Sequence, residues 1–282
     1  MIIFAGNERL AWRDPACFVY NGEYILFFTV SEKAEGYMYN RLGMSRSRDL
    51  KTWTEPQLLT PRDYHLNFCS PGNVIKYNGE FVLCFTSYPM PFPYAQSDCA
   101  DETARLFIMR TKDFEHFSEP EMLMVKGETP AEELGRMIDP FLLPKEDGFY
   151  LFYKQNGISH SFSTDLKHWE YRGHAGGGEN ACVIPFDGHY LLVHSPKNGI
   201  AFSVSDDLQN WTEYSRTTLA QEEWPWANGR VTAGFAMEAP ENCGYRYLLF
   251  FHGSRDEYPE THGSATLALA YTNDFKTFAF EC

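Results

Sequence analysis

The chain has 282 residues, of which 44% are hydrophobic, and its formal net charge is -14. The apolar content is enough to form a substantial core, which excludes a disordered chain. The acidic balance and the lack of any Lys/Arg-rich run exclude nucleic acid and anionic membrane surfaces as partners, because both select for basic patches.

The N-terminal segment 1–7 has no basic region and no long apolar stretch, so the sequence predicts neither a secretory leader nor a membrane-spanning helix. Seven cysteines are scattered without a C-x-x-C pair, which indicates neither a zinc cluster nor a disulfide framework. We therefore expect a cytoplasmic protein with reduced thiols, although a leader that had been trimmed would leave no trace in this sequence. The oligomeric state stays open.

One pattern recurs five times along the chain. Each unit contains a turn ending in Gly, followed by a continuous apolar run that is typical of a strand buried on both faces. These turns and runs span 21–28, 78–85, 147–153, 187–193 and 243–251. No stretch shows sustained helical periodicity.

A second motif, Ser/Thr-x-Asp-Leu/Phe-x-x-Trp/Phe, follows each apolar run. Its copies span 47–53, 111–117, 163–169, 205–211 and 272–278. The copies lie roughly 40 to 70 residues apart, which suits one four-stranded blade with variable loops. Because the Asp occurs once per unit, we interpret it as a turn residue rather than a catalytic one. The sequence thus predicts an all-β, five-bladed β-propeller with four antiparallel strands per blade, as a single domain over 1–282.

Acidic side chains occupy one position of this repeat. Counting back eight residues from the first Gly turn and nine from the next three gives Asp14, Ser70, Asp139 and Glu179. In a closed ring, equivalent positions converge on the axis, so we expect three carboxylates to share one cavity. Each Asp alone could simply cap a turn, but like charges at matched positions perturb one another's pKa values, as in acid/base sites. One protonated and one ionised carboxyl group are what glycoside hydrolysis requires.

Five segments together resemble glycoside hydrolase family 43, over nearly the whole chain. They are Arg13-Asp14-Pro15, Ser70-Pro71, Ile138-Asp139-Pro140, Gly178-Glu179-Asn180 and Phe251-His252-Gly253. The resemblance implies an inverting arabinofuranosidase, β-xylosidase or arabinanase acting on an oligosaccharide, with no metal in the chemistry.

The resemblance also implies a role for each carboxylate. Asp14 would be the general base, Glu179 the general acid, and Asp139 would orient that acid and tune its pKa. Inversion would place Asp14 and Glu179 roughly 6.5–9.5 Å apart. The chain reads Glu179-Asn180-Ala181 where that family usually has Glu-Gly-Pro, and it lacks the Asn-Asp-Pro-Asn-Gly and Glu-Cys motifs of invertase-like fructosidases.

Further candidates surround this predicted centre. Arg230 would bind a carboxylate or a sugar hydroxyl, or lie at the surface, and Ser70 would contact substrate. Trp12, Trp224 and Trp226 would be sugar platforms or packing residues. We predict no metal ligand cluster and no required cofactor; the resemblance admits a structural calcium or a water at His252, whose alternative is a satisfied core histidine.

Two rival functions remain at this stage. A propeller-type glycoside phosphorylase would need cationic side chains around a phosphate, for which Arg62, His65 and Arg136 are candidates. A non-catalytic carbohydrate-binding propeller would have carboxylates spaced wrongly for chemistry.

Overall fold

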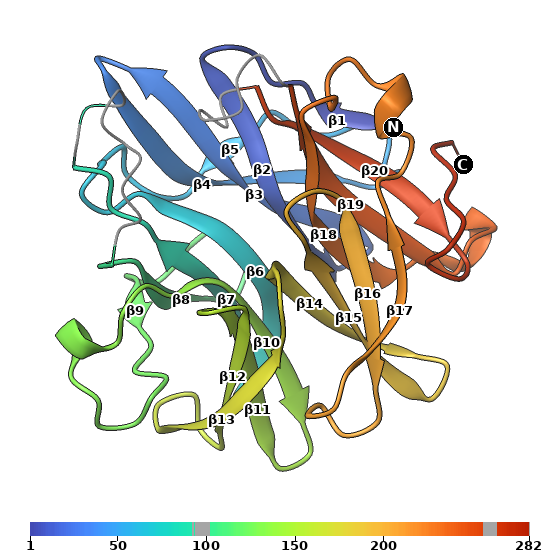
Figure 1. Cartoon of the computed structure of the whole chain (residues 1–282). Coiled ribbons are helices and arrows are strands. Elements are labelled where there is room, and N and C mark those ends of the chain that lie inside the picture. The colour runs from blue at the N-terminus through green and yellow to red at the C-terminus, as the bar shows by residue number, and fades with distance from the viewer. Residues whose placement is uncertain (92, 94–101, 256–263, 282) are drawn as a thin grey trace.

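The protein forms a ring of five antiparallel four-stranded sheets in a computed structural model, which describes residues 1–91, 93, 102–255 and 264–281 (Figure 1). Blade one contains β2 (Leu10–Tyr20), β3 (Glu23–Ala34), β4 (Tyr37–Ser47) and β5 (Gln57–Leu58). Blade two contains β6 (Phe68–Tyr77), β7 (Glu80–Ser87), β8 (Arg105–Thr111) and β9 (Glu121–Met122). Blade three contains β10 (Ile138–Lys145), β11 (Gly148–Lys154), β12 (Ile158–Ser163) and β13 (Trp169–Gly176).

Blade four contains β14 (Glu179–Phe186), β15 (His189–Ser195), β16 (Ile200–Ser205) and β17 (Thr212–Thr217). Blade five contains β18 (Arg230–Glu238), β19 (Tyr247–Ser254), β20 (Thr266–Thr272) and β1 (Ile2–Phe4). Short 3-10 turns lie at Ala131–Glu133, Gln221–Glu223 and Glu241–Cys243. The predicted all-β propeller of five four-stranded blades is confirmed, and no helix among the described residues is long and apolar enough to span a bilayer.

The N-terminus closes the ring. Strand β1 pairs antiparallel with β20 and so supplies the outermost strand of blade five, a connection that the repeat did not predict. The N-terminal amino group donates to the carbonyl oxygens of Leu269 and Phe280, at 2.8 and 3.2 Å. Figure 1 shows the N- and C-termini near each other beside this blade. Closure removes exposed sheet edges, and it joins the first strand to the last.

The second strand of each blade supplies the core, as its continuous apolar run predicts. Phe27, Phe85, Phe152, Val193 and Phe250 come from these five strands and are fully buried. Neighbouring blades therefore pack face to face through large side chains, and burying each of them stabilises the ring by about 1.5–3 kcal/mol.

The five Ser/Thr-x-Asp motifs are structural turns. Each motif Asp accepts backbone N–H bonds from the residues two and three positions later, at 2.7–2.9 Å. These backbone bonds lower the pKa of Asp49 to about 2. The residue after each Asp has a positive φ, between 54° and 63°, and its side chain is buried. The repeated Asp thus closes a turn in every blade.

The innermost strand of each blade carries a bulge at its axial end. The bulge residues are Asp14, Ser70, Asp139, Asn180 and Ala233, all with φ between +46° and +55°. Such backbone strain costs about 1–3 kcal/mol per residue and is typical of functional sites.

The predicted equivalence of Glu179 with Asp14 and Asp139 is wrong by one residue. In blade three the turn closes between Lys145 and Gly148, so Gly148 already lies in the strand. In blades one, two and four the Gly is the second turn residue. In blade two the bulge is one residue longer than in blades one, three and four. These two irregularities give a count of nine in blades two and three, whereas blades one and four need eight, so nine residues back from Gly188 lies Glu179 and the equivalent bulge residue is Asn180.

Candidate active site

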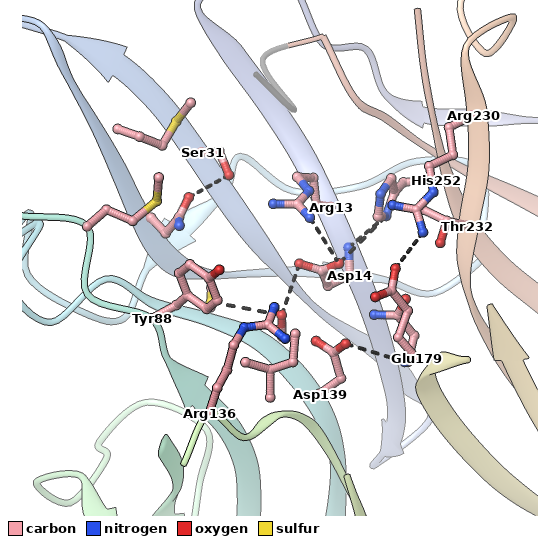
Figure 2. A pocket seen from close by; sticks show the side chains of 17 residues that line it. Arg13, Asp14, Ser31, Tyr88, Arg136, Asp139, Glu179, Arg230, Thr232 and His252 are labelled. Atoms are coloured by element: carbon pink, nitrogen blue, oxygen red, sulfur yellow. Dashed lines mark hydrogen bonds and ion pairs between the residues drawn. The ribbon is translucent and has the colours of Figure 1, made fainter. Parts of the chain in front are cut away.

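A cavity of about 210 Å³ opens at the axis where the bulges converge. Asp14, Ser70, Asp139 and Glu179 all line it, so the four predicted positions meet despite the offset at Glu179 (Figure 2). A cavity of this size is smaller than the roughly 300–1,000 Å³ of clefts that hold drug-sized ligands. It therefore suits a single small ring rather than a long chain.

Four bulge residues are tied to the preceding blade. Their N–H groups donate to Thr29 Oγ1, Thr86 Oγ1, Ser195 Oγ and His252 Nδ1, at distances of 2.7–3.1 Å. Each acceptor occupies the same place in its second strand, paired with the residue before that blade's own bulge. In blade three this place holds Lys154, which cannot accept a hydrogen bond. The bulge at Asn180 donates instead to Asp139 Oδ2, at 3.4 Å.

Asp14 is buried and receives hydroxyl hydrogen bonds on one oxygen. Thr29 Oγ1 lies 2.8 Å from Asp14 Oδ2, and Ser70 Oγ lies 3.3 Å from the same atom. Arg13 Nη2 lies 4.0 Å from Oδ1. Two hydroxyl donors thus hold one oxygen of Asp14, and a guanidinium lies near the other.

His252 is a buried neutral histidine in this arrangement. Its Nδ1 accepts the Asp14 N–H, so that nitrogen carries no proton and its 3.8 Å separation from Asp14 Oδ1 is not a hydrogen bond. Burial, together with the charges of Arg13 and Arg230, lowers the pKa of His252 well below its ordinary value. Its visible role is to hold the Asp14 backbone. Among the described residues, no group of three or more His, Cys, Asp or Glu side chains gathers as a metal site.

Asp139 is the carboxyl group with the raised pKa. Burial, then the charges of Glu179 and Asp14, raise the pKa of Asp139 to about 7. No Lys or Arg forms an ion pair with it among the described residues. Asp139 therefore loses its proton only as the pH rises through about 7.

Glu179 lies between two cations. Lys154 Nζ donates to Glu179 Oε2 at 2.7 Å, and Arg230 Nη2 donates to Oε1. Burial alone raises the pKa of Glu179, but these two partners outweigh it, so the pKa falls below its ordinary value. In the ligand-free protein Glu179 is thus ionised, unlike the protonated acid implied by the resemblance.

Glu179 also separates two spaces. On one side is the axial cavity; on the other is a more open groove of about 700 Å³ that Glu179 lines together with Lys154, Gly178, Lys197 and Arg230. A bond spanning the cavity and the groove would pass Glu179.

Several predicted site residues lie elsewhere. Trp12 stacks near Phe4 and Phe28, and its Nε1 donates to Ala5 O; Trp224 and Trp226 stack on each other with centroids 4.9 Å apart. None of the three lines the cavity, so the sugar-platform interpretation is corrected to packing. Apolar contacts on the core side hold all three rings.

Of the three residues predicted to bind phosphate in a phosphorylase, only Arg136 lines the cavity. Arg62 pairs with Glu32 and Glu35 outside the cavity, and His65 packs beside Tyr64. Arg136 lines the cavity, as does Arg230.

Sequence reasoning missed the functional position of Lys154, and it quoted Arg13 only as part of a motif. Lys154 had a signal, because a charge replaces the small polar residue or histidine found at the equivalent place of the second strand in the other blades. Arg13 had none, since the residue before each bulge differs in every blade.

Solved structures with the same fold are glycoside-active enzymes. The GH43_1 enzyme from Xanthomonas citri in complex with xylotriose matches with a TM-score of 0.67 at 16% identity, covering 99% of this chain and 93% of that one. An exo-1,5-α-L-arabinanase from a bovine ruminal metagenomic library matches with a TM-score of 0.66 at 13% identity, covering 100% and 99%. An exo-β-1,3-galactanase from Clostridium thermocellum matches with a TM-score of 0.67 at 16% identity, covering 94% and 60%. At these identities the likeness concerns the fold.

The search of curated proteins finds no match to this sequence. A family model, described as "Glycosyl hydrolases family 32 N-terminal domain", matches residues 12–183, which is more than half of the chain and includes Asp14, Asp139 and Glu179. The axial carboxylates thus lie within the segment that defines a family of glycosidases. The chain belongs to the glycosyl hydrolases family 32 N-terminal domain family and is a glycosidase with a five-bladed propeller fold.

Proposed function

We propose that the protein removes one terminal sugar, an arabinofuranosyl or xylosyl unit, from an oligosaccharide with inversion of configuration. The observation that carries this proposal is the position of Glu179 between the 210 Å³ cavity and the open groove. The cavity would hold the terminal ring and the groove would hold the leaving part. Glu179 would then lie beside the oxygen of the bond that breaks.

Asp14 is the general base of the proposed reaction. Thr29 and Ser70 hold one of its oxygens, which leaves Oδ1 as the atom to receive the proton of an attacking water. Water attacks the anomeric carbon on the face opposite to the leaving oxygen, and the configuration inverts. Ser70 thus positions the base, and the role predicted for it as a substrate contact is secondary.

Asp139 and Glu179 act as a pair that shares one proton. In the free enzyme the proton is on Asp139, because Lys154 and Arg230 hold Glu179 ionised. A leaving group that enters the groove competes with Lys154 for Glu179, and the proton then reaches the leaving oxygen through Glu179. Groups coupled in this way lose their protons in two steps whose pKa values belong to the pair, and here one pKa is raised and the other lowered.

The sugar class is proposed from the similar structures. Their titles name xylotriose as a bound ligand and arabinanase as an activity. A cavity with room for one ring also supports exo action over endo action, since an endo enzyme needs an open cleft on both sides of the bond.

A screen of nitrophenyl glycosides tests this proposal. We expect hydrolysis of the α-L-arabinofuranoside or the β-D-xyloside, with the inverted anomer as first product by NMR. Release of the retained anomer would contradict the role of Asp14 as base. Absence of turnover on every pentoside would contradict the sugar class.

A further inference from the structure

Three arginines line the axial cavity of a chain with a formal net charge of -14. They are Arg13, Arg136 and Arg230. Arg230 is bound to Glu179, so its charge is already compensated. Among the described residues, the charges of Arg13 and Arg136 have no such close carboxylate partner.

Arg13 and Arg136 have spare binding capacity. Arg13 has only the 4.0 Å ion pair with Asp14, and Arg136 makes no side-chain hydrogen bond within the described part of the chain. The Nε atom of each is buried and has no hydrogen-bond partner there. Figure 2 shows both guanidinium groups at the cavity, on either side of Asp14. Partly buried guanidinium groups without acceptors are costly unless a ligand supplies the acceptors.

Arg136 is held in place before any ligand arrives. Its backbone N–H donates to Glu102 Oε2 at 3.3 Å, and its carbonyl oxygen accepts from Gln155 Nε2 at 3.3 Å. Its Cζ lies 5.2 Å from the ring centroid of Tyr88, which also lines the cavity. The backbone of Arg136 is therefore fixed and an aromatic ring lies beside its guanidinium, which reduces the entropy that the side chain loses when it binds a planar or tetrahedral anion.

The charges in the cavity do not balance. When Asp139 holds its proton, two carboxylates face three guanidinium groups, and Lys154 adds a further positive charge at the rim. A neutral sugar offers hydroxyl groups only, whereas carboxylate, sulfate and phosphate match the forked geometry of arginine.

We propose that Arg13 and Arg136 bind an oxyanion, as a carboxylate, sulfate or phosphate group, in the axial cavity beside Asp14. The inference rests on the proposed function, in which this cavity holds the terminal sugar. The oxyanion is a substituent on the terminal sugar, such as the carboxylate by which a glucuronosyl unit differs from a xylosyl unit, or it is a free phosphate beside a neutral pentose. In the second case a phosphate oxygen bonds to the anomeric carbon while the glycosidic C–O bond breaks, and the leaving oxygen takes the proton from Glu179.

Calorimetric titration tests the site itself. Sulfate, phosphate and glucuronate are each titrated into the wild type, Arg136→Met and a matched control, Arg62→Met, whose arginine lies outside the cavity. We expect at least one anion to bind the wild type and Arg62→Met equally, and to bind Arg136→Met at least tenfold more weakly. No binding of any anion, or equal binding to all three proteins, would overturn the proposal.

Two substrates distinguish the sources of the oxyanion. A nitrophenyl β-glucuronide differs from the β-xyloside by one carboxylate on the ring, and both are assayed with and without inorganic phosphate. Arg136-dependent preference for the glucuronide assigns the anion to the sugar; Arg136-dependent release of sugar phosphate from the xyloside assigns it to free phosphate. If the xyloside is hydrolysed while no anion binds, the site is wrong and the proposed function stands. If anions bind through Arg136 while neither of these glycosides nor the α-L-arabinofuranoside is cleaved, the site stands and the proposed function fails.

Discussion

The Ser/Thr-x-Asp turns, here called the outer turns, and the axial bulges are both repeated five times. They differ in whether the side chain is repeated along with the backbone. All five outer turns keep the same Asp, and in each the carboxylate accepts the same two backbone N–H bonds. The five bulges keep the same strained backbone, yet they carry Asp, Ser, Asp, Asn and Ala. A side chain that is repeated serves the blade, whereas a side chain that varies at a repeated backbone position serves the site.

The second strands show the same contrast on a smaller scale. Four of them carry an acceptor for the next bulge opposite the residue that precedes their own bulge, and the fifth carries Lys154 at that place. Because Lys154 cannot accept a hydrogen bond, the Asn180 N–H donates to Asp139 instead. The Lys154 ammonium group pairs with Glu179. The Asp139–Glu179 part of the site therefore lies where blade three departs from the pattern of the other four blades.

The largest expected effect is that of Asp14→Asn. Removing the general base should lower kcat by about 10³-fold or more on every substrate, because no other group activates the water. The matched control is Asp165→Asn, which changes an outer-turn Asp in the same way. We expect the control to keep its activity and lose a few degrees of Tm, and equal activity losses in the two variants would remove the distinction between turn and site.

Glu179→Gln should lower activity according to the leaving group. Unactivated glycosides need a proton on the departing oxygen, so their kcat/KM should fall by about 10²–10⁴-fold. Dinitrophenyl glycosides need none and should lose far less. Kinetics on both substrates measure the difference, and equal losses would show that Glu179 does not deliver the proton.

Lys154→Met should move the pH profile rather than abolish activity. Without the ammonium group beside Glu179, the Asp139–Glu179 pair binds its proton more tightly, so the basic limb of kcat/KM should shift to higher pH. A basic limb at the same pH as in the wild type would mean that Lys154 does not lower the pKa of the Asp139–Glu179 pair.

The smallest expected effect is that of metal removal. We expect activity to survive EDTA, because the proposed chemistry uses only carboxylates. Assays before and after dialysis against the chelator, with calcium added back, check this. Loss of activity that calcium restores would reassign His252 to an ion site.

The fold was predictable because the features that build it are local and repeated. A Gly turn before each apolar run marks the hairpin, and each Ser/Thr-x-Asp motif marks the turn that follows the third strand of a blade. Strand β1 was not predictable in this way, since a three-residue strand that pairs across the chain leaves no periodic signal.

The site was predictable only in part. Asp14, Ser70 and Asp139 follow from their equivalence in the repeat, and all three line the cavity. Glu179 was found through a count that is one residue out, because the Gly lies one position later in blade three and the bulge is one residue longer in blade two. The charge state of Glu179 was beyond reach, since it depends on Arg230, which is distant in sequence and adjacent in space.

The pH dependence of kcat/KM in the wild type and in Asp139→Asn tests the central claim most directly, namely that Asp139 and Glu179 share one proton. That parameter reports the free enzyme. The wild type should lose activity as the pH rises through about 7, where Asp139 gives up its proton. In Asp139→Asn only Glu179 remains to hold it, and Lys154 and Arg230 favour its ionised form, so the basic limb should move to lower pH. A basic limb that is unchanged or moves to higher pH in Asp139→Asn would contradict the shared proton.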